Sequence, residues 1–253
     1  MMRNNTVMDS GDPSTNNTGG AGAGNDLFIG SMSATVNNLD GLIGEFIVFE
    51  GAPTAAEEDQ IQAYLALKYG ITMASMDYKD AAGTEIWDKD ANASFNNDIT
   101  GIGRDDISGL NQKQSKSINS DDILTMSTQA IAASNAANTT QLSNDVSFEM
   151  WANNGGSVAI QASEKPASFS QRLAREWLVQ ETGTVGGVTI EFDLTGLTFD
   201  NPTANKFGLV IDDDGDFSGG TQTTQVANSF SSDKLTFNSV DLSNGKYLSL
   251  IHI

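Results

Sequence analysis

The sequence contains no cysteine, one histidine, and 13 lysines and arginines against 33 aspartates and glutamates. Without cysteine, the chain can form no disulfide, thiolate metal site, iron–sulfur cluster or cysteine nucleophile. The single histidine, His252, is the penultimate residue, a poor position for a catalytic triad or a histidine-ligated metal. The formal net charge of −20 repels phosphate, so we expect no nucleic-acid partner. No apolar run approaches the roughly 20 residues of a membrane-spanning helix, so we expect no membrane insertion.

The remaining composition is that of a folded, turn-rich protein. Hydrophobic residues make up 38% of the 253 residues, with 25 glycines and only 4 prolines. A chain of this length can bury the core of one large β domain or of two smaller ones. Its acidity comes from a shortage of basic residues and not from a polyacidic tail, which argues against a disordered acidic segment.

The clearest helical signal covers residues 55–69. Thr54 and Glu57 have the spacing of a capping box, in which each side chain bonds the backbone amide of the other. Gly70 supplies a stop, because glycine readily adopts the left-handed conformation that ends a helix. Apolar residues recur between these signals at helical spacing, at Ile61, Tyr64, Leu65 and Tyr69.

Short apolar runs bounded by turn residues predict strands in the rest of the chain. They cover residues 27–30, 41–49, 99–104, 123–127, 147–152, 173–181, 185–194, 207–211, 234–240 and 246–250. In 41–49 both alternating faces are largely apolar, which predicts a strand buried inside a sandwich. The expected fold class is therefore mainly β: an antiparallel, jelly-roll-like β-sandwich with one helix at 55–69.

Two stretches carry a family resemblance. Gly-Leu-Ile-Gly-Glu-Phe-Ile-Val-Phe at 41–49 and Ile-Gln-Ala-Tyr-Leu-Ala-Leu-Lys-Tyr-Gly-Ile-Thr at 61–72 resemble the end of concanavalin-A-like, laminin-G-like lectin domains of bacterial surface proteins. In that family a closing jelly-roll strand precedes a helix ending in Tyr-Leu-x-x-Lys-Tyr-Gly. The resemblance implies that residues 1–73 are the C-terminal remnant of a lectin-like domain that ends in the helix.

The following residues resemble an uncharacterised β-sandwich module found after such domains in large secreted proteins. The matching stretches are Asn-Asp-Ile-Thr-Gly-Ile-Gly-Arg-Asp-Asp (97–106), Leu-Asn-Gln-Lys-Gln-Ser (110–115), Arg-Glu-Trp-Leu-Val-Gln-Glu-Thr-Gly (175–183) and Val-Ile-Asp-Asp-Asp-Gly-Asp-Phe (210–217). The resemblance implies that residues 74–253 form this second module. It implies no catalytic residues.

The two ends of the chain suggest a fragment. Leu248-Ser-Leu-Ile-His-Ile253 is what a common sequencing-adaptor end spells when translated, so we expect 248–253 to be adaptor-derived and the second module to be truncated. The alternative is a genuine last strand, because residues 247–251 alternate suitably. Since Met1 leads directly into loop-like sequence, the missing signal peptide gives no evidence for a cytoplasmic location.

The strongest candidate metal site is the run Asp212-Asp-Asp-Gly-Asp216, directly after the expected strand 207–211. Ca²⁺ takes six to eight oxygen ligands, and Asp212, Asp214 and Asp216 could aim three carboxylates at one ion. Aligned with an EF-hand loop, however, the run places Phe217 where glycine is required and Thr223 where the bidentate glutamate belongs. The alternative is an acidic, solvated turn.

Other polar motifs have simpler interpretations. Asp88-x-Asp90-x-Asn92 has metal-like spacing, but the later glycine and glutamate are missing. Gly101-Ile-Gly103 lacks the third glycine of a dinucleotide-binding loop and indicates close backbone packing or a strand bend. The adjacent Arg104, one of four arginines, is expected to pair with a neighbouring aspartate.

Jelly-roll folds also host laminarinase-type glycosidases, which act through paired carboxylates. Glu191 and Asp193 match the first two acids of that pattern, but Thr195 and Gly196 stand where the third acid belongs. On a strand, the two acids simply alternate outward from Ile190 and Phe192. Trp151 and Trp177, which could stack on sugars, lie in apolar strands and are expected in the core.

The sequence thus favours a protein that is not an enzyme. We expect a structural or adhesive module of a secreted or cell-surface bacterial protein, located outside the cell. Its expected partners are an extracellular glycan or neighbouring domains of the same chain, and its expected cofactor is Ca²⁺ at Asp212, Asp214 and Asp216. The alternative function is a carbohydrate-binding accessory module of a polysaccharide-degrading enzyme.

Overall fold

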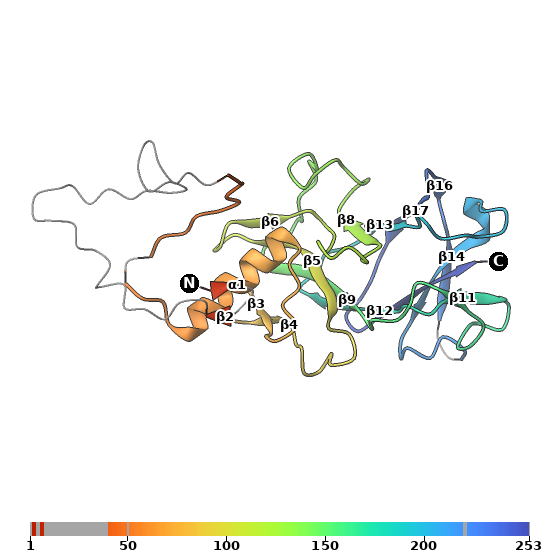
Figure 1. Cartoon of the computed structure of the whole chain (residues 1–253), viewed down its shortest axis with the longest axis horizontal. Helices are drawn as coiled ribbons and strands as arrows, with labels where there is room; N and C mark the ends of the chain where they lie inside the picture. The colour runs from red at the N-terminus through yellow and green to blue at the C-terminus, as the bar shows by residue number, and fades with distance from the viewer. Residues whose placement is uncertain (1, 4–5, 8–39, 50, 220–221, 253) are drawn as a thin grey trace, which may run out of the picture. The chain divides into compact units, whose positions relative to one another are not determined.

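A computed structural model describes residues 2–3, 6–7, 40–49, 51–219 and 222–252 of the chain. The chain divides into two compact units, 1–54 and 55–253. In the first unit, β1 (Met2–Arg3) and β2 (Thr6–Val7) form a short antiparallel pair. The strand expected at 27–30 lies outside the described residues. All further elements that the described residues form belong to the second unit (Figure 1).

The second unit is an antiparallel β-sandwich. The larger sheet has the order β10-β11-β18-β12-β9-β5-β6, with β14 paired to β18 and β15 to β14. Its strands are β5 (Asn97–Asp105), β6 (Leu110–Gln112), β9 (Ser147–Asn153), β10 (Ile160–Gln161), β11 (Gln171–Leu173), β12 (Trp177–Thr182), β14 (Phe207–Asp212), β15 (Thr223–Val226) and β18 (Tyr247–His252). This architecture confirms the expected fold class.

The second sheet has the order β16-β17-β13-β8-β7. Its strands are β7 (Gln114–Ser115), β8 (Leu124–Ser127), β13 (Val188–Asp193), β16 (Ser229–Ser231) and β17 (Lys234–Val240). A separate hairpin, β3 (Tyr78–Lys79) with β4 (Glu85–Trp87), and a 3-10 turn, Ala204–Lys206, complete the unit with the helix α1 (Ala55–Tyr69).

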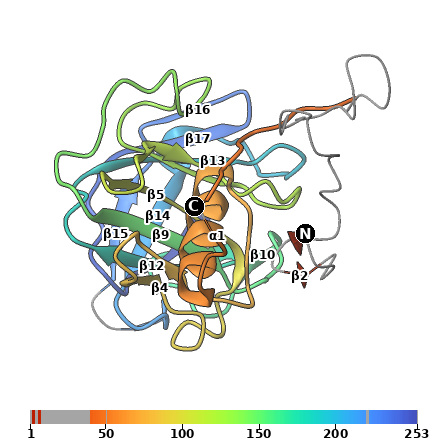
Figure 2. The same cartoon turned by 90° about the vertical axis from the view of Figure 1, so that its left-hand side faces the viewer.

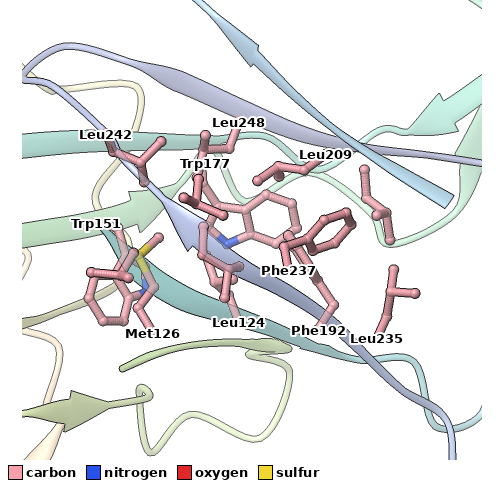
Figure 3. Close-up of a cluster of buried hydrophobic side chains, with 14 of the residues drawn as sticks. Leu124, Met126, Trp151, Trp177, Phe192, Leu209, Leu235, Phe237, Leu242 and Leu248 are labelled. Carbon is pink, nitrogen blue, oxygen red and sulfur yellow. The ribbon is translucent and has the colours of Figure 1, made fainter. Parts of the chain in front are cut away.

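The main core lies between the two sheets. Trp151 and Trp177 project from the larger sheet, and Phe192 projects from the smaller one (Figure 3). The Trp177 and Phe192 rings meet edge to face with centroids 5.3 Å apart, and Phe237 continues the stack at 6.0 Å from Phe192. Edge-to-face contacts of this kind add to the stabilisation that comes from apolar burial.

The outer face of the larger sheet is covered as well. In β9, Phe148 and Met150 pack in a second cluster with Leu67 of α1, while Trp151 faces the main core. All seven residues of β9 are therefore buried. Figure 2 looks onto α1, which lies over the β5 side of the sheet.

The two glycines of β5 make room for this outer layer. A Cβ on Gly101 would lie 2.4 Å from Sδ of Met150 and 3.1 Å from Cδ1 of Leu67, and one on Gly103 would lie 2.2 Å from Cδ1 of Phe148. Real Cβ atoms do not approach so closely, so any side chain would displace the residues above it. The close-packing interpretation of Gly101 and Gly103 is confirmed.

The helix α1 spans the residues that the sequence predicts. Gly70 has a φ of +65°, and the Ile71 amide donates to the Ala66 carbonyl at 2.9 Å, which is the hydrogen bond of a Schellman C-cap. The helix packs on the sandwich, and the compact unit that contains both begins at residue 55. The expected module boundary at 73 stays a prediction. The assignment of the earlier residues to a lectin-like domain stays a prediction.

Strand lengths follow the sequence pattern closely except at two places. The strand expected at 173–181 is divided into β11 and β12, because residues 174–176 leave the ladder and the Arg175 side chain enters a buried polar network. The prediction of a buried strand at 41–49 is wrong. Residues 40–49 form no strand, and Leu42, Phe46 and Val48 are exposed. The alternating apolar residues of 41–49 predict a neighbouring strand that pairs with them. No described residue forms a β ladder with this segment.

This exposure gives a first testable prediction. In the double variant Leu42→Lys, Val48→Lys we expect a free energy of unfolding within about 0.5 kcal/mol of wild type, because exposed side chains lose no packing. Urea denaturation followed by circular dichroism measures it. Leu67→Lys is the matched control and should destabilise strongly, since Leu67 is fully buried between α1 and the larger sheet. A comparable loss in the double variant would show that 41–49 packs against the protein.

Candidate functional site

The acidic loop that follows β14 begins at a buried residue. Asp212 is 1% exposed, and its Oδ2 accepts the amides of Asp214 at 3.3 Å and Gly215 at 2.8 Å. Asp214 in turn accepts the Asp216 amide at 3.0 Å, and Asp216 accepts both the amide and the hydroxyl of Ser218. Each carboxylate thus organises the backbone two residues further on, as aspartates do in tight turns.

One oxygen of this loop has no partner. Oδ1 of Asp212 is buried and accepts no hydrogen bond. Burial raises the pKa of Asp212, and the neighbouring Asp214 carboxyl raises it further. By contrast, the hydrogen bonds from Ser218 lower the pKa of Asp216. Two carboxyl groups that face each other with an orphan oxygen are a site where a cation would relieve both burial and repulsion.

The loop is anchored to the body of the sandwich. Gly215 has a φ of +81°, and a Cβ there would lie 3.2 Å from the Tyr247 ring, so glycine avoids both backbone strain and a tight contact. Phe217 is fully buried, and the Arg172 guanidinium lies 4.8 Å from the centre of its ring. Asp213 forms an ion pair with Lys246.

The structure brings together only part of the expected calcium set. Asp212 and Asp214 interact, whereas Asp216 is directed at Ser218. Among the residues that the structure describes, no three acidic or histidine side chains are arranged to hold a metal ion. Ca²⁺ binding would therefore require the Asp216 carboxylate to turn from Ser218 towards the other two.

A buried polar network, which the sequence analysis missed, lies at the start of β5. Asp98, 5% exposed with a φ of +55°, accepts Asn119 Nδ2 at 2.7 Å and Asn153 Nδ2 at 2.6 Å. Nη1 of Arg175 lies 3.7 Å from Oδ2 of Asp98, and its Nε donates to the Gly156 carbonyl at 2.8 Å. The network joins four segments that are far apart in the sequence.

The second buried arginine holds another loop. Arg172 is 1% exposed and donates to Glu176 Oε1 at 2.5 Å and to Glu164 Oε2 at 2.8 Å. It also donates to the Leu173 carbonyl. Two of the four arginines, Arg172 and Arg175, are thus buried in ion pairs. The small number of arginines in this acidic chain was the one sequence signal that could have indicated such a role.

Asp122 belongs to the same end of the sandwich as Asp98. It is 4% exposed and accepts the amides of Ser117 at 2.8 Å and Leu124 at 3.0 Å. Burial raises its pKa to about 7, with a further contribution from Asp98. These contacts fix the loop before β8.

The remaining sequence candidates have structural roles. Arg104 donates to both carboxylate oxygens of Asp106 at 2.8 Å, which confirms the expected ion pair. Asp88 accepts the amides of residues 90 and 91, as in an ordinary turn. Asp193 pairs with Lys234 on the outer face of β13, while its neighbours on the strand are buried. Trp151 and Trp177 lie in the core, as expected.

Residues 247–252 form β18, which pairs with β14 along its whole length. His252 is buried between Phe199 and Phe207, with ring centroids 5.2 and 4.7 Å away. This position agrees with the alternative in which these residues are a strand of the fold. Burial lowers the pKa of His252, so the ring is neutral near pH 7.

The fold and its loops define a class of protein: an antiparallel β-sandwich module covered on one outer face by a helix. Residues 57–246, about three quarters of the chain, match the family model described as Domain of unknown function (DUF8202), and the chain belongs to this family. The match begins within α1 and ends just before β18. No curated protein and no solved structure gave a significant match. In the described part of the chain, no helix combines the length and apolar character that crossing a bilayer requires.

Proposed function

We propose that this chain is a non-catalytic structural or adhesive module of a secreted or cell-surface bacterial protein, and that the loop 212–216 binds Ca²⁺. Its partners in this role are neighbouring domains of the same protein or an extracellular glycan. The observation that carries the calcium proposal is the orphan Oδ1 of buried Asp212 beside the Asp214 carboxyl. A hard divalent cation supplies the missing counter-charge.

The use of the buried charges supports a structural role. Asp98, Asp122, Arg172 and Arg175 all bond to backbone groups or to one another, and each fixes a loop on the sandwich. Such interactions hold the shape of the loops and of the sandwich beneath them. The fold is thus well suited to transmit load or to present loops at a cell surface.

The calcium proposal assigns a role to each residue of the loop. Asp212 provides a rigid ligand at the end of β14, and Asp214 provides the second. Asp216 completes the set by exchanging its bonds to Ser218 for the ion. Because Phe217 follows directly and is buried against Arg172, the ion would fix the loop to the sandwich.

The alternative, a carbohydrate-binding accessory module, has weaker support. Sugar recognition commonly uses exposed aromatic faces. Trp87, Trp151 and Trp177 are at most 1% exposed, so none of them offers a stacking surface. A glycan-array experiment with and without Ca²⁺ distinguishes this role from a purely structural one.

The calcium site is tested by thermal unfolding. A ligand that binds only the folded state at a hundredfold excess over Kd stabilises it by about 2.7 kcal/mol. Extracellular modules bind at about 10⁻⁴–10⁻³ M, so this excess is reached at about 10–100 mM Ca²⁺. We expect Ca²⁺ at these concentrations to raise the Tm and chelator to reverse it. Mg²⁺ should act weakly, because it demands a compact octahedron.

Two variants make the calcium test specific. Asp212→Asn should abolish the response, while Asp233→Asn, an exposed aspartate with a φ of +59°, should keep it. Asparagine tolerates this left-handed conformation, so the control remains folded. A wild-type Tm that ignores Ca²⁺, or an Asp212→Asn variant with the full response, would return the loop to an acidic turn.

A further inference from the structure

A second carboxyl group in the sandwich has no use in the proposed function. Glu149 lies in the middle of β9 and is 0% exposed, and neither of its carboxyl oxygens has a hydrogen-bond partner. The alternation of the strand places Glu149 on the same face as Trp151. The Trp151 side chain belongs to the main core (Figure 3). An ionised carboxylate cannot be held there without a large desolvation cost.

The surroundings of Glu149 make ionisation still less favourable. On β12, Glu181 is its direct ladder partner, and beyond β17 the charge of Asp241 also acts on it. On β5 it faces the apolar Ile102. The cation of that strand, Arg104, is bound to Asp106 and to the carbonyls of Leu142 and Ser143. Within the described residues, the two charges that act on Glu149 are those of Glu181 and Asp241, and both are negative.

The loops 183–187 and 241–245 are hydrogen-bonded to β12, the strand that pairs with β9 at Glu149. The Val185 amide donates to Glu181 Oε1 at 2.9 Å, and Val185 packs against the main core. The Gly245 amide donates to the Val179 carbonyl at 2.9 Å, and the side chain of Asn244 accepts the Glu181 amide. Any charge that forms on Glu149 therefore has to be solvated by opening this end of the fold.

We propose that Glu149 is a proton-binding switch, which locks the sandwich when neutral and loosens the loops 183–187 and 241–245 when it ionises. The direction of the effect follows from linkage. Burial, and then Glu181 and Asp241, raise the pKa of Glu149 well above its ordinary value of 4.5. Below that value both folded and unfolded states are protonated, so the switch has no effect. Above it only the unfolded chain loses the proton, and stability falls as pH rises until the folded pKa is passed.

Chemical denaturation between about pH 5 and about pH 8 tests the switch, with chelator present so that Ca²⁺ does not contribute. Glu149→Gln mimics the neutral acid. The ratio of its unfolding constant to that of wild type should fall by about tenfold or more as the pH rises over this range. The raised pKa of Asp122 also makes stability fall as the pH rises. Because Asp122 is present in both proteins, its contribution cancels when their unfolding constants are compared at each pH. Glu85→Gln, an exposed position on β4, should give a flat ratio.

Hydrogen exchange locates the opening. Amides of 183–187 and 241–245 should exchange faster at high pH in wild type, beyond the intrinsic pH dependence, and this excess should vanish in Glu149→Gln. If the variant does not fold, infrared spectra of wild type with ¹³C-labelled glutamate decide the question. A protonated glutamate band that persists at neutral pH supports the switch. Its absence in the folded protein, or a pH-independent ratio for Glu149→Gln, overturns it.

Discussion

Replacing Arg175 by alanine should destabilise the protein by about 3–5 kcal/mol, because the change leaves Asp98 buried without its counter-charge. Both side chains are at most 6% exposed, and Arg175 also donates to the carbonyls of Gly156 at 2.8 Å and Asp121 at 2.6 Å. Those acceptors would lose their donor in the same step. Urea denaturation at neutral pH measures the loss.

A double-mutant cycle separates the ion pair from the rest. Asp98→Asn retains the shape of the side chain and removes its charge, so Arg175→Ala should cost less in that background. Arg104→Ala is the matched control, because Arg104 pairs with Asp106 at the surface and such pairs contribute little. Equal costs of Arg175→Ala in the two backgrounds would show that the arginine acts only through its carbonyl contacts.

The helix and the long strands could be predicted because their signals are local. α1 has its stop residue at Gly70, and strands such as β17 extend over enough residues for the alternation of apolar side chains to be visible. Strands of two to four residues, such as β7 and β10, carry no such period. Their positions depend on the neighbouring strand with which they pair, which is a property of the tertiary structure.

The candidate sites likewise divide into those with a local sequence signal and those that depend on tertiary structure. The loop after β14 is visible in the sequence because its aspartates are adjacent, although the direction of each carboxylate is not. The pairing of Asp98 with Arg175 depends on how β5, β9 and β12 lie side by side, so no local pattern reveals it. Glu149 left a weak signal, since Phe148, Met150 and Trp151 make both faces of that strand apolar.

The segment 41–49 illustrates the opposite case. Its apolar residues predict burial, but a periodic pattern does not identify the surface that covers them. In the described structure Leu42 and Val48 are exposed, while α1, a few residues later, is packed on the sandwich. The change from exposed to packed chain therefore falls near residue 54, where the two compact units meet in the sequence.

Trp177→Ala should cost about 3–5 kcal/mol, because it removes a fully buried indole from between the two sheets. Trp177→Phe should cost much less. The indole Nε1 of Trp177 has no hydrogen-bond partner, so phenylalanine loses part of the ring and no polar contact. Its edge-to-face contact with Phe192 can persist.

Trp87 provides the matched comparison for this prediction. It is equally buried, but its Nε1 donates to Asn96 Oδ1 at 3.1 Å. Trp87→Phe therefore breaks a hydrogen bond and should cost about 1 kcal/mol more than Trp177→Phe. Urea denaturation of the four proteins, wild type and the three variants, gives the comparison. If Trp177→Phe were as costly as Trp177→Ala, the indole N–H would have to bond a buried group or water, and the dry interior between the sheets would be disproved.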